Sequence, residues 1–274
     1  MKTTMLPATL VSAVRERRAI LFVGAGVSMN LGLPSFRQLV DHIGEDLGFD
    51  ADIFNTFGDY QSLAEFYVLE KRIGPLRSWM DRSWHPDSIE IKDSDVHRLI
   101  VELEFPIVYT TNYDRWLERA YSAYGKPIHK IASVGDLVKT KPGASTEIIK
   151  FHGDFDDDAS IVLTESTYFE RMSFETPLDI RLRSDSLARP LLFVGYSLSD
   201  PNMRYLLYKL QQLWSISPSP GTRPKSYILM TRPNPVQEAV LRQRGVEAVL
   251  WTGTDPGEAL SGFLQQLRNE VSFV

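Results

Sequence analysis

The chain has 274 residues, of which 43% are hydrophobic, and its 30 basic and 35 acidic residues leave a formal net charge of −5. It contains no cysteine, which excludes disulfides, thiolate nucleophiles and cysteine-bound zinc or iron–sulfur centres. The small acidic excess, without a long basic run, argues against direct binding of nucleic acid through phosphate contacts. This length fits one domain over residues 1–274.

The beginning of the chain predicts neither a secretory signal nor a membrane anchor. Arg15, Arg17 and Arg18 follow the apolar part of this segment, whereas the basic residues of a signal peptide precede it. The apolar run at 19–23 is far shorter than a bilayer-spanning helix. We therefore expect a cytoplasmic protein without membrane contact.

Short apolar runs that are rich in β-branched residues alternate with helical patterns along the chain. Such runs are typical of strands buried on both faces, so the predicted fold class is α/β, a Rossmann-like doubly wound parallel sheet. The expected strands are 19–23, 106–109, 148–151, 191–194, 227–230 and 248–251. The expected helices between and around them are 9–17, 112–124, 202–214, 235–244 and 257–271.

Residues 37–104 interrupt this alternation and predict a helical insertion that covers the sheet. Its helical patterns lie at 37–47, 61–71 and 94–104. For Trp79 and Trp84, which fall in the insertion, a core or interface role outweighs a role in ligand binding. Farther along the chain, a short strand is expected at 161–163.

A Gly-Ala-Gly-Val-Ser sequence at 24–28 follows the first expected strand. Gly24 and Gly26 allow a tight turn whose bare N–H groups can hold a pyrophosphate, and Ser28 adds a hydroxyl donor. The same glycines also occur where one chain segment packs closely on another. Ser28 replaces the usual third glycine of a dinucleotide-binding motif, and no isolated acidic residue is placed to bind a ribose. Both observations disfavour an ordinary dehydrogenase.

Two polar residues stand at the carboxyl ends of later strands, where ligands bind in open α/β sheets. Asn112 carries an amide that both donates and accepts, which suits holding a ribose hydroxyl and a water; it is also a candidate N-cap of the following helix. His152 closes another strand, with Gly153 allowing a sharp turn, and a neutral imidazole can take a proton from a hydroxyl or from water. The other histidines are expected to be structural or on the surface.

Other charged residues near these motifs carry weaker signals. Four carboxylates that follow His152 lack the ligand spacing of a calcium loop, so a solvated hairpin tip is expected at Asp154, Asp156, Asp157 and Asp158. Arg37 either neutralises a phosphate or gates the pocket, or it is an ordinary helix-surface residue.

Four blocks in order resemble the Sir2 (sirtuin) family. Gly24–Ser28 with the Gly-Leu-Pro-Ser-Phe-Arg block at 32–37 is similar to the loop that holds NAD, and Thr-Thr-Asn-Tyr-Asp at 110–114 is similar to the Asn-motif. Phe-His-Gly at 151–153 matches the catalytic His-Gly, and Gly-Tyr-Ser-Leu-Ser-Asp-Pro at 195–201 has the form found in bacterial SIR2-like proteins. The resemblance implies a site built on these blocks. Asn112 and His152 are expected to be its catalytic residues. The residues expected to bind NAD are Gly24, Ala25, Gly26, Ser28, Phe36, Arg37, Thr111, Asp114, Gly195, Tyr196, Ser197 and Asp200.

The departures from the family narrow the expected activity. Deacylating sirtuins carry a zinc module held by four cysteines after the His-Gly block, whereas this chain has no cysteine and Pro190 follows His152 by only 38 positions. Thr111 and Tyr113 replace a glutamine and an aliphatic residue of the Asn-motif. The resemblance therefore implies a metal-free NAD glycohydrolase that releases nicotinamide and ADP-ribose, of the type of bacterial anti-phage SIR2-like effectors.

Control of such an activity and some alternatives remain open. The length leaves no room for a fused sensor, so we expect gating by homo-oligomerisation or by a separate protein subunit, for example a HerA-type ATPase or another defence protein. The alternatives are an ADP-ribosyltransferase, a zinc-free deacylase and a non-catalytic sensor of NAD or ADP-ribose. The choice between NAD and NADP is also open.

Overall fold

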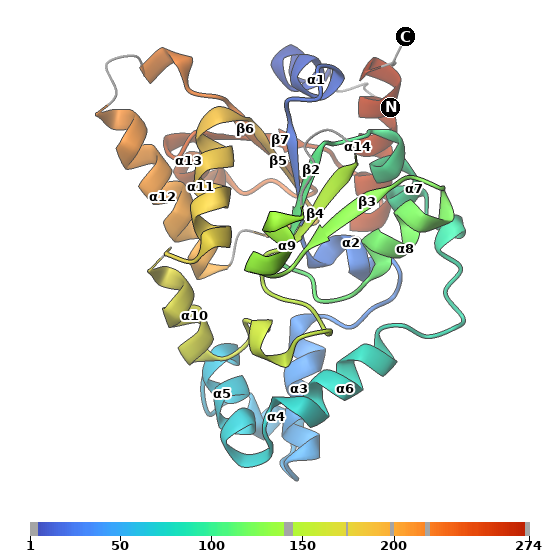
Figure 1. The fold of residues 1–274 in the computed structure, drawn as a ribbon, viewed down its shortest axis with the longest axis vertical. Helices are drawn as coiled ribbons and strands as arrows, with labels where there is room; N and C mark the ends of the chain where they lie inside the picture. The colour runs from blue at the N-terminus through green and yellow to red at the C-terminus, as the bar shows by residue number, and fades with distance from the viewer. Residues whose placement is uncertain (1–4, 140–144, 174, 198–199, 217–219, 272–274) are drawn as a thin grey trace.

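A computed structural model of the protein describes residues 5–139, 145–173, 175–197, 200–216 and 220–271 (Figure 1). A seven-stranded sheet, in which every ladder is parallel, runs through its centre in the order β3-β4-β2-β1-β5-β6-β7. The strands are β1 (Ile20–Val23), β2 (Ile107–Thr110), β3 (Ile128–Ile131), β4 (Thr146–Lys150), β5 (Leu191–Val194), β6 (Ser226–Met230) and β7 (Val246–Leu250). The predicted α/β class is confirmed.

The strands are apolar on both faces because helices cover both sides of the sheet. In β1, Leu21 belongs to one hydrophobic cluster and Phe22 to the other, and both are fully buried. Such two-sided burial explains the near-continuous apolar runs. The larger cluster includes residues of α1 (Ala8–Arg15), α7 (Asp95–Glu102), α8 (Trp116–Ala123) and α14 (Pro256–Val271), and the smaller one includes residues of α11 (Pro177–Ala188), α12 (Pro201–Ser215) and α13 (Pro235–Gln243).

Helices fill the whole stretch between β1 and β2, and no strand occurs in residues 24–106, all of which the structure describes. After α2 (Ala25–Met29) the helices are α3 (Phe36–Asp46), α4 (Ala51–Phe54), α5 (Tyr60–Lys71), α6 (Ile73–Ser83), the 3₁₀ turn η1 (Ile91–Asp93) and α7. Figure 1 shows α3 to α6 gathered beyond one end of the sheet, next to α10 (Glu165–Met172). The chain therefore closes that end of the sheet with helices.

Two expectations about single elements are wrong, and one strand was not predicted. The edge strand β3 escaped prediction because its sequence, Ile-His-Lys-Ile, is half polar and only half buried. Residues 161–163 form no strand. Asn112 is not an N-cap, because α8 begins at Trp116, four residues later.

The remaining elements are short and lie in the connections between strands and helices. They are α9 (Val134–Val138), η2 (Asp158–Ser160) and η3 (Pro220–Thr222). Among the described residues, no helix combines the length and the apolar character needed to cross a membrane.

Candidate active site

A cavity of about 560 Å³ lies at the carboxyl ends of five neighbouring strands. Residues one or two positions after the strands β4, β2, β1, β5 and β6 all line it, and α2, α3, α5, α10 and α14 complete its wall. The chain crosses from one half of the sheet to the other between β1 and β5, so the cavity lies at the topological switch point, where α/β folds bind ligands. The five strand-end residues are His152, Thr111, Ala25, Gly195 and Thr231.

The glycine turn after β1 is packed tightly against the loop after β5. A Cβ on Gly24 would lie 2.4 Å from the Gly195 carbonyl oxygen, and a Cβ on Gly26 would lie 2.9 Å from the Gly195 Cα. The Gly26 N–H donates to the Gly195 carbonyl at 2.8 Å, and the Gly24 N–H donates to the Val194 carbonyl at 3.0 Å. The sequence led us to expect bare N–H groups at this turn. These two are instead hydrogen-bonded, because they join the two loops that form the floor of the cavity.

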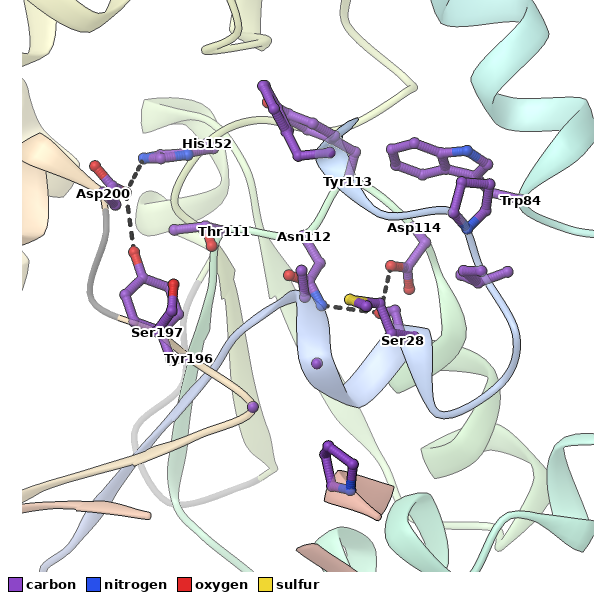
Figure 2. Close-up of a pocket in the computed structure, with 18 of the residues that line it drawn as sticks. Ser28, Trp84, Thr111, Asn112, Tyr113, Asp114, His152, Tyr196, Ser197 and Asp200 are labelled. Atoms are coloured by element: carbon purple, nitrogen blue, oxygen red, sulfur yellow. Dashed lines mark hydrogen bonds and ion pairs between the residues drawn. The ribbon is translucent and has the colours of Figure 1, made fainter. Parts of the chain in front are cut away.

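The side-chain amide of Asn112 is held in one orientation. Its Nδ2 donates to the Gly24 carbonyl at 3.1 Å and to the Ser28 hydroxyl at 2.9 Å. Both amide hydrogens are thus used within the protein, and the carbonyl oxygen Oδ1 is left as the group available to a ligand. Figure 2 shows the amide nitrogen turned toward Ser28.

Ser28 joins Asn112 to Asp114. The Ser28 hydroxyl donates to Asp114 Oδ2 at 2.6 Å, and Asp114 Oδ1 accepts the backbone N–H of Trp116 at 3.1 Å. Ser28 and Asp114 are both buried. The hydroxyl hydrogen of Ser28 is therefore engaged by a carboxylate rather than aimed at a phosphate, and this network holds the Asn112 amide in place.

A buried lysine supports the same loop from beneath. Lys150, the last residue of β4, is 1% exposed, and its ammonium donates to the backbone carbonyls of Tyr113, at 3.2 Å, and Asp114. Glu118 on α8 lies 3.5 Å from the ammonium and supplies its counter-charge. The loop that carries Asn112 is thus attached to β4 through a charged group.

His152 is neutral at pH 7. Its side chain is 3% exposed, stacks on Phe151 and meets the edge of the Tyr168 ring. This burial lowers the pKa of His152 to about 4, although the Asp200 carboxylate, 3.3 Å from Nε2, acts in the opposite direction. Gly153 turns the chain after it with φ of 92°, as expected, at a point where a Cβ would meet the Ser160 carbonyl at 2.1 Å. A neutral imidazole can accept or orient a proton.

Tyr196 and Asp200 form a second polar group near His152. The Tyr196 hydroxyl donates to Asp200 Oδ2 at 2.9 Å, and burial together with this carboxylate raises the pKa of Tyr196 well above its ordinary value. Ser197 lies on the cavity rim, where its carbonyl accepts from Gln237 Nε2 at 2.8 Å. Figure 2 shows this group beyond Thr111 from the Asn112–Ser28–Asp114 network.

Most of the predicted site residues come together on this cavity; the two exceptions are Gly24 and Arg37. Phe36 lines it from the start of α3, with its ring 5.7 Å from the ring of Tyr60. Gly24 is adjacent to the lining and acts through its carbonyl. Arg37 is not on the lining: its side chain is 62% exposed and faces Asp52 at 3.7 Å. Its placement fits an ordinary helix-surface residue.

Comparison with protein families gives one match that covers just over half of the chain. The family model described as "SIR2-like domain" matches residues 106–249. The chain belongs to the SIR2-like family. The match contains the blocks with Asn112, His152 and the Gly195 loop, and the glycine turn after β1 precedes it.

Curated relatives of this SIR2-like chain carry related names. "NAD(+) hydrolase ThsA" from Bacillus cereus (strain MSX-D12) is 29% identical over 73% of this chain and 41% of its own length, and its namesake from Enterococcus faecium is 31% identical over 71% and 40%. "Defense-associated sirtuin 2" from Bacillus subtilis is 27% identical over 83% of this chain and 22% of its own length. The chain spans about two fifths of the length of the ThsA proteins.

Solved structures agree with the SIR2-like fold. A structure titled as a Sir2 homolog–NAD complex superposes with a TM-score of 0.51 at 14% identity, covering 98% of this chain and 96% of the other. A Sir2 homologue mutant in complex with ADP-ribose gives the same TM-score over 98% and 99%. At this identity the likeness concerns the fold.

The acidic turn of this SIR2-like chain is a hairpin closed by a bridge between Asp154 and Asp157, and Asp156 and Asp157 are exposed as expected, but its carboxylates are paired or buried rather than simply solvated. Asp154 is 1% exposed and lies 3.2 Å from Lys130, while Asp156 pairs with Lys130 at 2.6 Å and with Arg115 at 3.0 Å. Asp158 pairs with Arg77 of α6 at 2.7 Å. In the part of the chain that is described, no group of three or more potential ligands could hold a metal ion.

Several cavity residues were not found from the sequence. Trp84 lies on the cavity wall as well as in the core, because the end of α6 folds back over the loop that carries Tyr113. Tyr168 comes from α10, which carries no SIR2-like motif. Thr231 directly follows β6, so the strand-end signal that indicated Asn112 and His152 also applies to it.

Proposed function

We propose that this chain hydrolyses NAD to nicotinamide and ADP-ribose, and that it serves as a gated effector in bacterial anti-phage defence. The observation that carries the proposal is the fixed Asn112 amide, whose two hydrogens are held within the protein while its carbonyl oxygen stays available to a ligand. A neutral His152 lines the same cavity. The names of the ThsA relatives and of the defence-associated sirtuin support the same activity and context.

The reaction breaks the bond between the ribose C1′ and the nicotinamide nitrogen, and water supplies the new C1′–O bond. Nicotinamide leaves as a neutral molecule from a pyridinium, so its departure requires no proton donor. The transition state has oxocarbenium character, as in glycoside hydrolysis. Asn112 Oδ1 accepts from a ribose hydroxyl or from the water, and His152 orients or accepts the proton that the water loses.

The charges that line the cavity suit a substrate whose reacting half is cationic. Among the described residues, the charged side chains of the lining are the carboxylates of Asp114 and Asp200. A negative potential favours the nicotinamide ribose, where positive charge lies in the ground state and in the transition state. Metal-free hydrolysis is consistent with this lining and stays part of the proposal.

An enzyme that consumes NAD must be restrained in a living cell. We propose activation in the cytoplasm by self-association or by a separate protein subunit. The ThsA relatives are more than twice as long as their part that matches this chain. Besides self-association and a separate subunit, a further segment joined to this domain is therefore a third candidate source of control.

The test incubates the protein with NAD, alone and together with the longer chain or candidate partner, and measures nicotinamide and ADP-ribose by chromatography. Asn112→Ala and His152→Ala should each lower the rate by about 100-fold or more. Asn269→Ala and His129→Ala make the same changes outside the cavity and serve as controls. Continued turnover by both cavity variants, ADP-ribose transferred to protein, or nucleotide binding without product would each overturn the proposal.

A further inference from the structure

We propose that Asp200 is a positioning residue for His152, one that fixes the imidazole as the tautomer with hydrogen on Nε2 and leaves Nδ1 as the acceptor nitrogen. The structural part of this inference concerns the free protein. Its kinetic part rests on the proposed hydrolysis of NAD.

The Asp200 carboxylate is itself held by partners on both oxygens. Oδ1 accepts the backbone N–H of Asn202 at 2.8 Å, which makes Asp200 the N-cap of α12. Oδ2 accepts the Tyr196 hydroxyl at 2.9 Å and faces His152 Nε2 at 3.3 Å (Figure 2). A carboxylate fixed in this way presents a lone pair to one ring nitrogen and to no other.

Burial of the ring nitrogen selects its protonation. His152 Nε2 is inaccessible to solvent and has no completed hydrogen bond within the described residues. If Nε2 carried no hydrogen, its lone pair would face the carboxylate lone pair across 3.3 Å in a buried setting, which is repulsive. With hydrogen on Nε2, a small rotation of the ring completes a charge-assisted hydrogen bond.

The other described groups around the ring do not compete for this nitrogen. Phe151 and Tyr168 contact it through their rings, with centroids 5.8 Å and 5.5 Å away. The Arg171 guanidinium of α10 lies over the Phe151 ring and pairs with Asp179 at 2.9 Å. Asp200 therefore remains the acceptor for Nε2.

This assignment differs from the role expected from the sequence, in which Asp200 binds NAD. Both of its oxygens already face protein donors, and a carboxylate is an unfavourable neighbour for the anionic pyrophosphate of a dinucleotide. Asp200 therefore acts through His152 rather than through direct contact with the substrate.

Two substitutions separate this role from the capping of α12. Asp200→Asn keeps an efficient N-cap, because Oδ1 still accepts from Asn202, but it places an NH₂ group where Oδ2 faced His152. That group donates to Nε2 and drives the hydrogen to Nδ1. Asp200→Ser also keeps a capping oxygen but does not reach the ring. Asp50→Asn, at the N-cap of α4, is the matched control.

The first measurement is a long-range ¹H–¹⁵N correlation spectrum of protein labelled with ¹⁵N-histidine at pH 7, with His152→Gln used to assign the His152 signals. We expect Nε2 of the unaltered protein to resonate as a protonated nitrogen and Nδ1 as an unprotonated one. Asp200→Asn should reverse the pair, Asp200→Ser should give a mixture, and Asp50→Asn should change nothing. A hydrogen on Nδ1 in the unaltered protein, or a pattern insensitive to Asp200, would overturn the proposal even if the protein proved inactive on NAD.

The second measurement compares kcat and KM for NAD in the activated enzyme. Asp200→Asn should lower kcat by about 100-fold, because the acceptor nitrogen becomes a donor, while KM changes less than about threefold. Equal losses in kcat for Asp50→Asn, or full kcat in Asp200→Asn despite a reversed tautomer, would show that this positioning does not serve catalysis. Loss of NAD binding alone would return Asp200 to a role in substrate contact.

Discussion

At the scale of single residues, the site depends on side chains that hold one another. Asn112 has a defined orientation because Gly24 and Ser28 accept its two hydrogens, and Ser28 in turn donates to Asp114. An amide in solution presents either end to a ligand, whereas this one presents its oxygen. The chemistry of Asn112 thus depends on a serine that itself need not contact the substrate.

Ser28→Ala tests this dependence. It leaves one hydrogen of Asn112 and one oxygen of Asp114 without their partner in a buried place, so we expect a loss of about 1–3 kcal/mol in the free energy of unfolding. The rate of the proposed NAD hydrolysis should fall about tenfold as the amide loses its fixed orientation. Urea unfolding and NAD turnover measure the two effects. Ser215→Ala removes an exposed hydroxyl bond and should change neither; an equal effect there would contradict the prediction.

Some site residues could be predicted from the sequence because polar side chains directly after apolar strands meet at one edge of a parallel sheet. Asn112 and His152 follow this rule. Trp84 and Tyr168 do not, because they reach the cavity through the packing of α6 on α5 and η2 and of α10 on α5 and α12, and no local pattern encodes that packing. Arg37 is adjacent to Phe36 in sequence, but the turn of α3 directs its guanidinium toward Asp52.

At the scale of elements, β4 and α8 are joined by a buried charge. The Lys150 ammonium contacts two carbonyls of the Asn112 loop and lies 3.5 Å from Glu118, whose carboxylate oxygens have no hydrogen-bond partner among the described residues. Removal of one member of such a pair leaves an uncompensated buried charge. The pair therefore couples the stability of the fold to the geometry of the site.

Lys150→Met should lower the free energy of unfolding by about 3–5 kcal/mol, because Glu118 is left buried and unpaired. The double variant Lys150→Met/Glu118→Leu should recover a large part of that loss, while the rate of the proposed NAD hydrolysis stays low because the loop carbonyls have lost their donor. Urea unfolding of the single and double variants completes the cycle. Additive losses in the cycle would show that the two side chains do not interact.

Most core strands were predictable because a strand buried on both faces must be apolar throughout. The six expected strands lie within two residues of β1, β2, β4, β5, β6 and β7. The edge strand β3 has one side open, so polar residues are tolerated there and its pattern disappears. The short helix α4 and the helix α6, which contains Gly74 and Pro75 in its first turn, were also not found.

At the scale of the whole molecule, two buried histidines make the fold sensitive to acid. Burial lowers the pKa of His97 and of His152 to about 4 each, against about 6.5 in the unfolded chain. Between pH 6.5 and 4 the unfolded chain binds protons that the folded chain does not, so stability is complete above this window and is lost as the pH falls through it. Each histidine accounts for about 3 kcal/mol of the free energy of unfolding that is lost across this window.

Urea unfolding between pH 7 and 4.5 should therefore show a free energy of unfolding that decreases as the pH falls. The slope of this decrease should be about half as steep in His97→Gln, and less steep again in the double variant with His152→Gln. The slope against pH is the quantity to compare, since the substitutions also change packing. Slopes that match the unaltered protein would mean that both rings titrate alike in the folded and the unfolded chain, which would contradict the lowered pKa values.

The cavity lining also bears on the choice between NAD and NADP, which the sequence left open. Leu229, Thr231, Pro256 and Leu260 line its β6–α14 side, and none of the described lining residues is a lysine or arginine. The additional 2′-phosphate of NADP would find no cation there. We expect kcat/KM for NADP to be at least about tenfold below that for NAD, with a smaller ratio in Thr231→Arg. Equal rates on both nucleotides would contradict this.

The position of Asp200 at the start of α12 gives the site a mechanical connection to a distant surface. The helix has 15 residues, a length of about 22 Å, and its last turn lies far from the cavity. A rigid rod that is tilted at one end also moves at the other, and here the near end carries the carboxylate that faces His152. A molecule that binds near Ser215 and tilts α12 would therefore displace Asp200. That displacement would change the direction of the His152 hydrogen without any contact with the cavity.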